Sequence, residues 1–145
     1  MIARFFRPVM LATALFGWVS TAAAGTVDTA HQRLVRFTGA VIVGPEALAP
    51  LLAPGHQIMR ANGVGYDRQE YLDTGLGKLS IRPVFSHEEP VVSGDENFMV
   101  VRYSLDIEEK VDGEPVKRRA PGLTVFGNID GQWRVVAHAN LSVRS

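Results

Sequence analysis

Two polar side chains near the end of the sequence, His138 and Asn140, have the types and the spacing of a ligand-binding pair. They are two residues apart, so within a strand they project from the same face. An imidazole beside an amide can hydrogen-bond a ligand carbonyl or orient a water molecule. Because they alternate with the apolar Trp133, Val135 and Ala137, we expect them on the opposite face of that strand. The sequence leaves open which face lines a cavity, and a dimer-interface or satisfied surface histidine is the alternative.

Arg102 lies between Val101 and Tyr103 in an otherwise apolar segment. Inside a cavity, the planar fork of its guanidinium would clamp a carboxylate or a phosphate. Asp106 is four residues further on, and on the same face of a strand. The alternative is a pairing of Arg102 with an acidic neighbour across an exposed face of a sheet.

Asp67 is a second candidate for acid or base chemistry. It would serve as a general base if burial raised its pKa. The spacing from Asp67 to Glu70 is also that of a capping box, which explains both residues as the start of a helix. Asn62 is likewise accounted for by the Asn62-Gly63 turn that precedes them.

Two charged runs have little support as binding sites. His87, Glu88 and Glu89 are consecutive, so in a strand they point to opposite faces and cannot all reach one ion. His31 and His56 lie in other segments without ligand spacing, and we expect no metal site. The basic run 117–119 alternates across a strand; it is an anion-binding surface or, as for most such runs, a solvated one.

The composition excludes several classes of protein. The 145 residues include fifteen Lys and Arg, fifteen Asp and Glu and no Cys. Without a basic excess, a dedicated nucleic-acid-binding protein is disfavoured. Without cysteine there are no disulfides, thiolate metal sites or cysteine nucleophiles. With 46% hydrophobic and 21% charged residues, the sequence is that of a single globular domain.

The first 24 residues have the pattern of a signal peptide. Arg4 and Arg7 precede an uncharged apolar run over 9–19, and three alanines over 22–24 follow it. The run is shorter than the roughly 20 apolar residues of a spanning helix. We therefore expect cleavage after Ala24, export to the periplasm or the medium, no stable membrane insertion afterwards, and one domain over 25–145. An uncleaved anchor is the alternative.

The mature sequence opens with helical periodicity. Apolar residues recur at steps of three and four over 27–41, which predicts a helix ended by Gly44. Pro45 suits the first position of a short second helix that closes at Pro50 or at the Pro54-Gly55 turn. A short strand over 56–61, the Asn62-Gly63 turn and a third helix over 68–76, ended by Gly75 and Gly77, complete this half.

The remainder predicts four longer strands, over 79–92, 97–110, 115–128 and 132–143. Turn residues at 93–95, 112–113 and 130–131 separate them, so consecutive hairpins form an antiparallel meander. Alternation places Met99, Tyr103 and Ile107 on one face of the second of these strands. Pro83 and Pro90 cannot donate ladder hydrogen bonds, so the first long strand is an edge strand or is bulged.

This order of elements resembles the nuclear transport factor 2-like superfamily, which includes SnoaL-type cyclases, ketosteroid isomerase and scytalone dehydratase. The chain is most similar to its uncharacterised, often exported bacterial members. The resemblance covers nearly all of the mature chain and rests on 60–63, 67–72, 101–103, 123–126 and 131–140, of which the tryptophan strand at 131–140 is the most specific. It implies an α+β fold: a cone-shaped, curved antiparallel sheet covered on one face by three N-terminal helices.

The resemblance further implies a largely apolar cavity between the sheet and the helices, and dimerisation through the other face of the sheet. In such cones the segment with Asn62, Tyr66 and Asp67 borders the cavity mouth. The carboxylate and tyrosine pattern of the isomerases and the histidine and tyrosine pattern of the dehydratases are not recognisable here.

The sequence therefore favours an exported domain that binds a small, largely apolar molecule, without a cofactor, through Arg102, His138, Asn140, Asn62 and Tyr66. One alternative is a small isomerase, dehydratase or cyclase with His138 or Asp67 as acid and base. The other is a structural or protein-interaction module whose cavity is plugged by side chains such as Phe85, Phe98, Phe126 or Met99.

Overall fold

The computed structural model describes residues 22–74, 82–85, 90–111 and 114–142. Some of the features predicted above lie outside these residues, namely most of the signal peptide, Gly75 and Gly77, the 87–89 run and the turn at 112–113. Cleavage after Ala24 therefore stays a prediction. Among the helices of the described residues, none combines the length and the apolar character that a membrane span requires.

The helices begin and end close to where their sequence signals predict. α1 (Ala22–Val43) buries one stripe of residues and ends at Gly44, whose φ of 130° lies in a region that few residues other than glycine adopt. Pro45 then begins α2 (Pro45–Leu48), which continues as the 3-10 turn η1 (Ala49–Leu51). α3 (Arg68–Asp73) starts with the predicted capping box and ends three residues earlier than expected.

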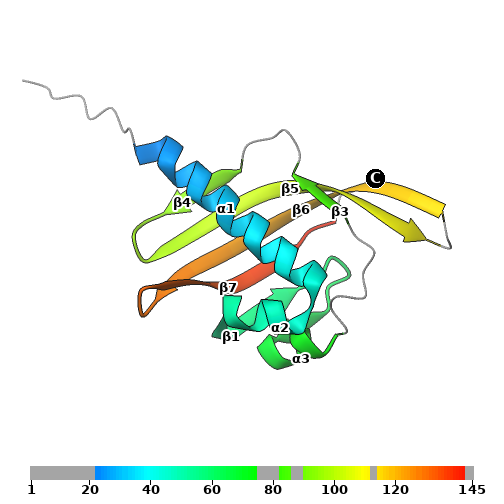
Figure 1. The fold of residues 1–145 in the computed structure, drawn as a ribbon, viewed down its shortest axis with the longest axis horizontal. Coiled ribbons are helices and arrows are strands. Elements are labelled where there is room, and N and C mark those ends of the chain that lie inside the picture. The colour runs from blue at the N-terminus through cyan, green and yellow to red at the C-terminus, as the bar shows by residue number, and fades with distance from the viewer. Residues whose placement is uncertain (1–21, 75–81, 86–89, 112–113, 143–145) are drawn as a thin grey trace, which may run out of the picture.

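The seven strands form one curved, mixed sheet. Its order is β2-β1-β7-β6-β5-β3, with β4 also paired to β5. The strands are β1 (Leu52–Met59), β2 (Gly65–Asp67), β3 (Arg82–Phe85), β4 (Val91–Gly94), β5 (Phe98–Val111), β6 (Glu114–Ile129) and β7 (Gln132–Asn140). All pairs are antiparallel except β1 with β7, which the meander prediction missed. α1 crosses one face of the sheet, while α2 and α3 lie at the end near β1 (Figure 1).

Two predicted strand boundaries are wrong. The Pro54-Gly55 dipeptide does not close a helix but lies inside β1, which begins at Leu52. The single strand expected over 79–92 is two short strands, β3 and β4, both paired to β5. The expectation of an edge position is confirmed, because β3 ends the strand order and Pro83 in it has no amide hydrogen to donate.

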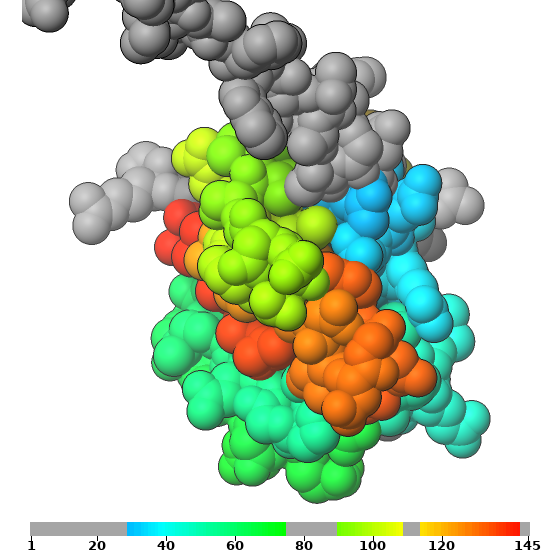
Figure 2. All heavy atoms as spheres, turned by 90° about the vertical axis from the view of Figure 1, so that its left-hand side faces the viewer, coloured from blue at the N-terminus to red at the C-terminus, as the bar shows by residue number. Residues whose placement is uncertain are grey.

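The turns explain why the long strands run side by side. Asn62 accepts a hydrogen bond from the Val64 amide at 3.1 Å, and Gly63 takes a φ of 83°. Asp130 and Gly131 both have positive φ in the turn between β6 and β7, as two-residue hairpin turns require. Figure 2 shows this turn and the one between β4 and β5 next to each other, beside α1.

A β-bulge in β7 changes which residues face the helices. Phe126 of β6 opposes Val135, but the preceding Val125 opposes Ala137, so Val136 is an extra residue in β7. After the bulge, His138 lies on the same face as Val135, and both are buried. The expectation that His138 and Asn140 project from the face opposite to Val135 is therefore wrong, because simple alternation does not hold across a bulge.

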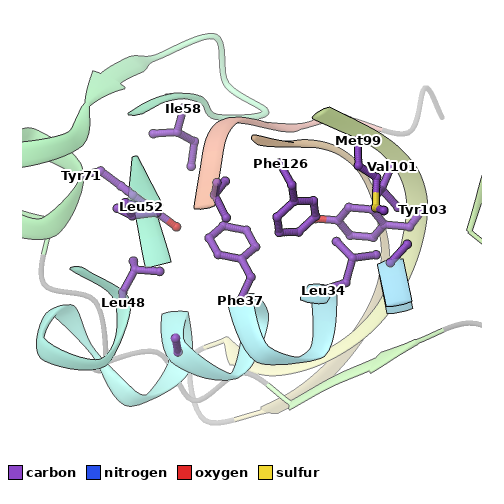
Figure 3. Packing of buried hydrophobic residues seen from close by; sticks show 13 residues of the cluster. Leu34, Phe37, Leu48, Leu52, Ile58, Tyr71, Met99, Val101, Tyr103 and Phe126 are labelled. Atoms are coloured by element: carbon purple, nitrogen blue, oxygen red, sulfur yellow. The ribbon is translucent and has the colours of Figure 1, made fainter. Parts of the chain in front are cut away.

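The core lies between α1 and the concave face of the sheet. Phe37 of α1 points into its centre, with Leu34, Tyr103 and Phe126 on one side and Leu48 and Leu52 on the other (Figure 3). Phe126 and Met99 are thus core residues, whereas Phe98 is 46% exposed and the side chain of Phe85 is outside the described part. Phe126, Met99 and Phe98 do not line the cavity described below.

Gly122 on β6 makes room for the ring of Tyr103, and this predicts a large effect for one methyl group. A Cβ at residue 122 would lie 2.8 Å from Tyr103 Cζ, and that ring is held by a buried hydrogen bond to Thr124. Gly122→Ala should lower the free energy of unfolding by about 1–3 kcal/mol in urea titrations. Gly55→Ala, whose added Cβ would have nothing within 4 Å, is the control. Equal stabilities of the two variants would contradict this packing.

Candidate functional site

A cavity of about 340 Å³ lies between the C-terminal half of α1 and the sheet. Its wall is mostly apolar, and the small Ala120 of β6 lies beside the larger Leu105 of β5. Apolar and aromatic side chains form the wall, namely Phe37, Val41, Ile42, Tyr103, Leu105, Ile107, Ala120 and Leu141. Polar contacts come from Arg60, Asn62, Arg118, His138 and Asn140. This size and composition are typical of small-molecule sites.

Four polar side chains form a continuous hydrogen-bonded chain at the floor of this cavity. The Tyr103 hydroxyl lies 3.2 Å from Thr124 Oγ1, and Thr124 Oγ1 lies 2.9 Å from His138 Nδ1. His138 Nε2 lies 2.8 Å from Asn140 Oδ1. The ring of Phe37 packs edge-on against the imidazole at a centroid distance of 5.1 Å. The chain thus runs from the buried core to the polar edge of the cavity.

The direction of these hydrogen bonds follows from the chemistry of the last pair. The Asn140 Oδ1 atom only accepts, so His138 Nε2 carries the hydrogen and donates to it. In the neutral ring Nδ1 then accepts from the Thr124 hydroxyl, whose oxygen in turn accepts from Tyr103. The Asn140 amide is thereby fixed with its Nδ2 hydrogens as the donors that remain for a ligand.

Burial holds the imidazole in this neutral state. Desolvation is the main reason that the pKa of His138 falls to about 4, and the positive charges of His56 and Arg60 lower it further, against the hydrogen bond to Asn140, which raises it. Burial likewise raises the pKa of the Tyr103 hydroxyl to about 12. Both groups therefore stay uncharged at neutral pH. Because both ring nitrogens are engaged in hydrogen bonds, His138 orients Thr124 and Asn140 and has no free nitrogen for proton transfer.

Arg60 is one of two arginines that line the cavity, the other being Arg118. Its guanidinium lies 5.8 Å from the centroid of the Tyr66 ring and 5.6 Å from that of Tyr71. Such cation-π contacts orient the charge without neutralising it. Arg60 Nε is buried and has no hydrogen-bond partner among the described residues. No ion pair to Arg60 is found in that part of the chain either, so the cation is held in place and left without a counter-charge.

The structure brings together some of the predicted site residues. His138 and Asn140 line the cavity, Asn62 lies at its rim, and Tyr66 contributes through its contact with Arg60. Arg102 does not line the cavity. It is exposed on the opposite face, across from Leu123, and Asp106 is exposed there across from Arg119. The expectation that Arg102 clamps a ligand inside the cavity is therefore wrong, because residue 102 alternates with the buried Val101 and Tyr103.

Asp67 is exposed and occupied as a helix cap. It accepts from the Glu70 amide at 2.9 Å, while its own amide donates to the Glu70 side chain. It lines a groove on the outer face of the sheet and not the cavity. The structure thus favours the capping interpretation of Asp67 over that of a general base.

The histidines of the described residues form no cluster with acidic groups. Within those residues, no three His, Asp or Glu side chains come together as metal ligands would. His31 is exposed on α1, and His56 is buried with Nδ1 donating to the Val135 carbonyl at 3.1 Å. In the basic run, Lys117 pairs with Glu108 at 2.7 Å and Arg118 lies at the cavity, so these charges separate between the two faces as predicted.

Sequence reasoning missed Arg60, Tyr103 and Thr124 as parts of the site. Arg60 follows β1 directly and precedes the Asn62-Gly63 turn, which places it at the cavity mouth. A charged residue between a buried strand and a tight turn was the available signal. Thr124 offered a weaker one, because it is a polar residue that alternates with Phe126 and is fully buried.

The chain has the nuclear transport factor 2-like fold. A candidate dehydratase of the NTF2-like family from Streptomyces avermitilis superposes with a TM-score of 0.72 at 16% identity, covering 85% of this chain and 99% of that one. An NTF2-like protein from Cytophaga hutchinsonii gives 0.65 at 18%, covering 80% and 97%. The CaMKII hub homology domain from Chlamydomonas reinhardtii gives 0.61 at 20%, covering 86% and 99%.

These likenesses confirm the fold expected from the sequence. Identities of this size do not carry a reaction or a ligand from one protein to another. No family model matches the sequence, and no curated protein matches it. The function therefore has to be argued from the cavity itself.

The neutral, buried imidazole predicts a pH-dependent stability. The folded pKa of His138 is about 4 and its ordinary value is 6.5, so the unfolded chain takes up the proton first as the pH falls. The stability that depends on neutral His138 is complete above pH 6.5 and is lost between pH 6.5 and 4. From the size of the pKa shift, this pH-dependent part of the free energy of unfolding amounts to about 3 kcal/mol.

Urea unfolding at several pH values measures this pH-dependent part of the free energy of unfolding. The wild-type protein should lose more stability over this window than His138→Gln, which cannot titrate there. His56, whose pKa is also lowered by burial, titrates in both proteins, so the difference between the profiles reports His138 together with its coupling to His56. The ¹⁵N shifts of the wild-type ring should report a neutral Nε2–H tautomer at pH 6. Parallel profiles for the two proteins, or an imidazolium at pH 6, would contradict the assignment.

Proposed function

We propose that this protein is an exported domain that binds a small, largely apolar molecule in the cavity between α1 and the sheet. The observation that carries this proposal is the open space of about 340 Å³ itself, with an apolar wall and polar groups gathered on one side. An apolar body gains from leaving water for such a wall, and the polar groups would fix its orientation. Export rests on the signal-peptide pattern of the first 24 residues.

The engagement of His138 favours binding over acid and base catalysis. A general base needs a free lone pair directed at the substrate, and both His138 nitrogens are already within 2.9 Å of protein partners. The isomerase, dehydratase or cyclase alternative would require this chain of hydrogen bonds to open. A binding site requires no such change.

Filling the cavity tests the proposal directly. Val41 lines the cavity, whereas Val35 on the same helix is 45% exposed on its outer face. Val41→Phe should abolish the fluorescence increase of the neutral dye N-phenyl-1-naphthylamine, and Val35→Phe should retain it. Both variants place one phenyl group on α1, so the pair isolates occupancy of the cavity. The full chain is expressed in a bacterial host and recovered from its periplasm, where its mass should correspond to a chain that begins at Gly25.

No dye binding by the wild-type protein, or equal binding by the two variants, would refute binding in this cavity. Protein retained in the cytoplasm with an intact N-terminus would refute export and leave the binding measurement to be judged separately.

The outer face of the sheet supports a second proposal, that two copies of this chain associate through it. A groove of about 470 Å³ on this face is lined by apolar residues of β1, β6 and β7, among them Met59, Leu123 and Val125. Met59 and Leu123 are 49% and 36% exposed. Exposed apolar patches of this kind mark interaction surfaces.

The charges around this groove fit a second copy. Asp67 and Glu70 border it near β2, and Arg102 lies across from Leu123 on the side of β5. In a two-fold pair the acidic border of one protomer would face the basic border of the other. One structural neighbour is named as the association domain of C. elegans CaMKII, and this name agrees with self-association.

One charge in the groove should separate the copies. Leu123→Asp is expected to convert a dimer into a monomer in sedimentation or light-scattering measurements, because a buried, unpaired carboxylate opposes association. Val116→Asp is the matched control, since Val116 is also on β6 and equally exposed, at 36%, but does not line the groove. A monomeric wild-type protein, or loss of the dimer in both variants, would refute this interface.

A further inference from the structure

The polar groups of the cavity share one property, which is that they are donors. Arg60 and Arg118 are cations, and the Asn140 amide is held with its Nδ2 hydrogens outward. Two amide oxygens of the cavity are already occupied. Asn62 Oδ1 accepts from the Val64 amide, and Asn140 Oδ1 accepts from His138 Nε2. Among the described residues that line the cavity, none is acidic. With no carboxylate in that lining, the Arg60 guanidinium leaves a positive charge at the site.

Arg60 is the donor that most favours an anionic partner. An arginine that is partly buried is normally paired, because desolvating its charge costs free energy that a carboxylate offsets. Here the guanidinium contacts two tyrosine rings, and its Nε atom is buried without a hydrogen-bond partner in the described chain. The pairing of a planar fork with two carboxylate oxygens is the geometry that this group favours.

The chain from Tyr103 to Asn140 gives the second donor its fixed orientation. In the other neutral tautomer of His138, Nε2 would accept, and the Asn140 amide would turn its nitrogen to the ring and its oxygen to the cavity. The hydrogen bond from His138 Nε2 at 2.8 Å excludes this arrangement and leaves the amide as a donor. His138 is in this sense a positioning residue for Asn140.

We propose that the molecule bound in this cavity is a monocarboxylate with an apolar body, its carboxylate held by Arg60 and the Asn140 amide and its body against the wall formed by α1 and β5. This inference rests on the proposed binding function and names its ligand class. A neutral ligand would leave the Arg60 charge unpaired, and a cation would be repelled by it. The length of the apolar wall and the volume of about 340 Å³ suit a ligand of about a dozen non-hydrogen atoms.

A series of three ligands with the same body tests the head group. These are 4-phenylbutanoate, 4-phenylbutanamide and 4-phenylbutan-1-ol, titrated by calorimetry at pH 7.5. The acid should bind about tenfold or more tightly than the amide, since a charge-assisted hydrogen bond contributes more than a neutral one. Its affinity should fall as salt is raised, and that of the amide should not.

Two variants assign the preference to the proposed donors. Arg60→Met should reduce the affinity for the acid to that for the amide, with the amide unchanged. Arg36→Met, which removes an exposed arginine from α1 outside the cavity, is the matched control and should bind both ligands as the wild type does. Asn140→Asp keeps an acceptor for His138 but replaces the donor with a negative charge, so it should weaken only the acid.

The outcomes separate this inference from the function on which it rests. Equal affinities for acid and amide, or binding of the neutral dye and the alcohol without the acid, would overturn the carboxylate assignment and leave the binding function standing. Binding of none of these compounds, the dye included, would overturn both. If Arg60→Met does not fold, the salt dependence of the acid against the amide and the Asn140→Asp variant still decide the question.

Discussion

The extra residue in β7 is the constraint on which the site depends. Without Val136 in excess, strict alternation would turn His138 and Asn140 to the outer face of the sheet, away from α1. The bulge keeps Val135 against the core and also brings His138 under Phe37, whose ring packs edge-on against the imidazole. A single insertion thus satisfies two requirements of one strand, an apolar half that packs and a polar half that lines a cavity.

The cavity exists because the two long strands carry side chains of different size. β5 presents Leu105 and Ile107 to the helix, while β6 places the small Ala120 beside Leu105. Further back on α1, Leu34 and Phe37 are buried against the sheet and keep the helix at a distance from it. The helix therefore cannot settle into the space left by Ala120. Rigid packing at one end of α1 maintains the open volume at the other.

Much of this fold could be predicted from the sequence, because its signals come from residues that are close together along the chain. The apolar stripe of α1, the capping box at Asp67 and the turns at Asn62-Gly63 and Asp130-Gly131 are each fixed by neighbouring residues, and each is confirmed. The site was less predictable because it depends on register. Nothing near residue 136 signals a bulge, so alternation alone puts His138 on the wrong face. The parallel pairing of β1 with β7 was missed for the same reason, since it joins segments about 80 residues apart.

Arg102 and Arg60 show why residue type alone did not identify the cation of the site. Both are single arginines that follow an apolar residue, and a fork suited to carboxylates is present in each. Alternation with the buried Val101 and Tyr103 exposes Arg102 on the outer face. Arg60 escapes this rule because it lies one residue beyond β1, where the turn redirects the chain toward the cavity and Tyr66 and Tyr71 receive its side chain. Its role comes from three elements that meet only in the folded protein, which is why a pattern within one segment could not reveal it.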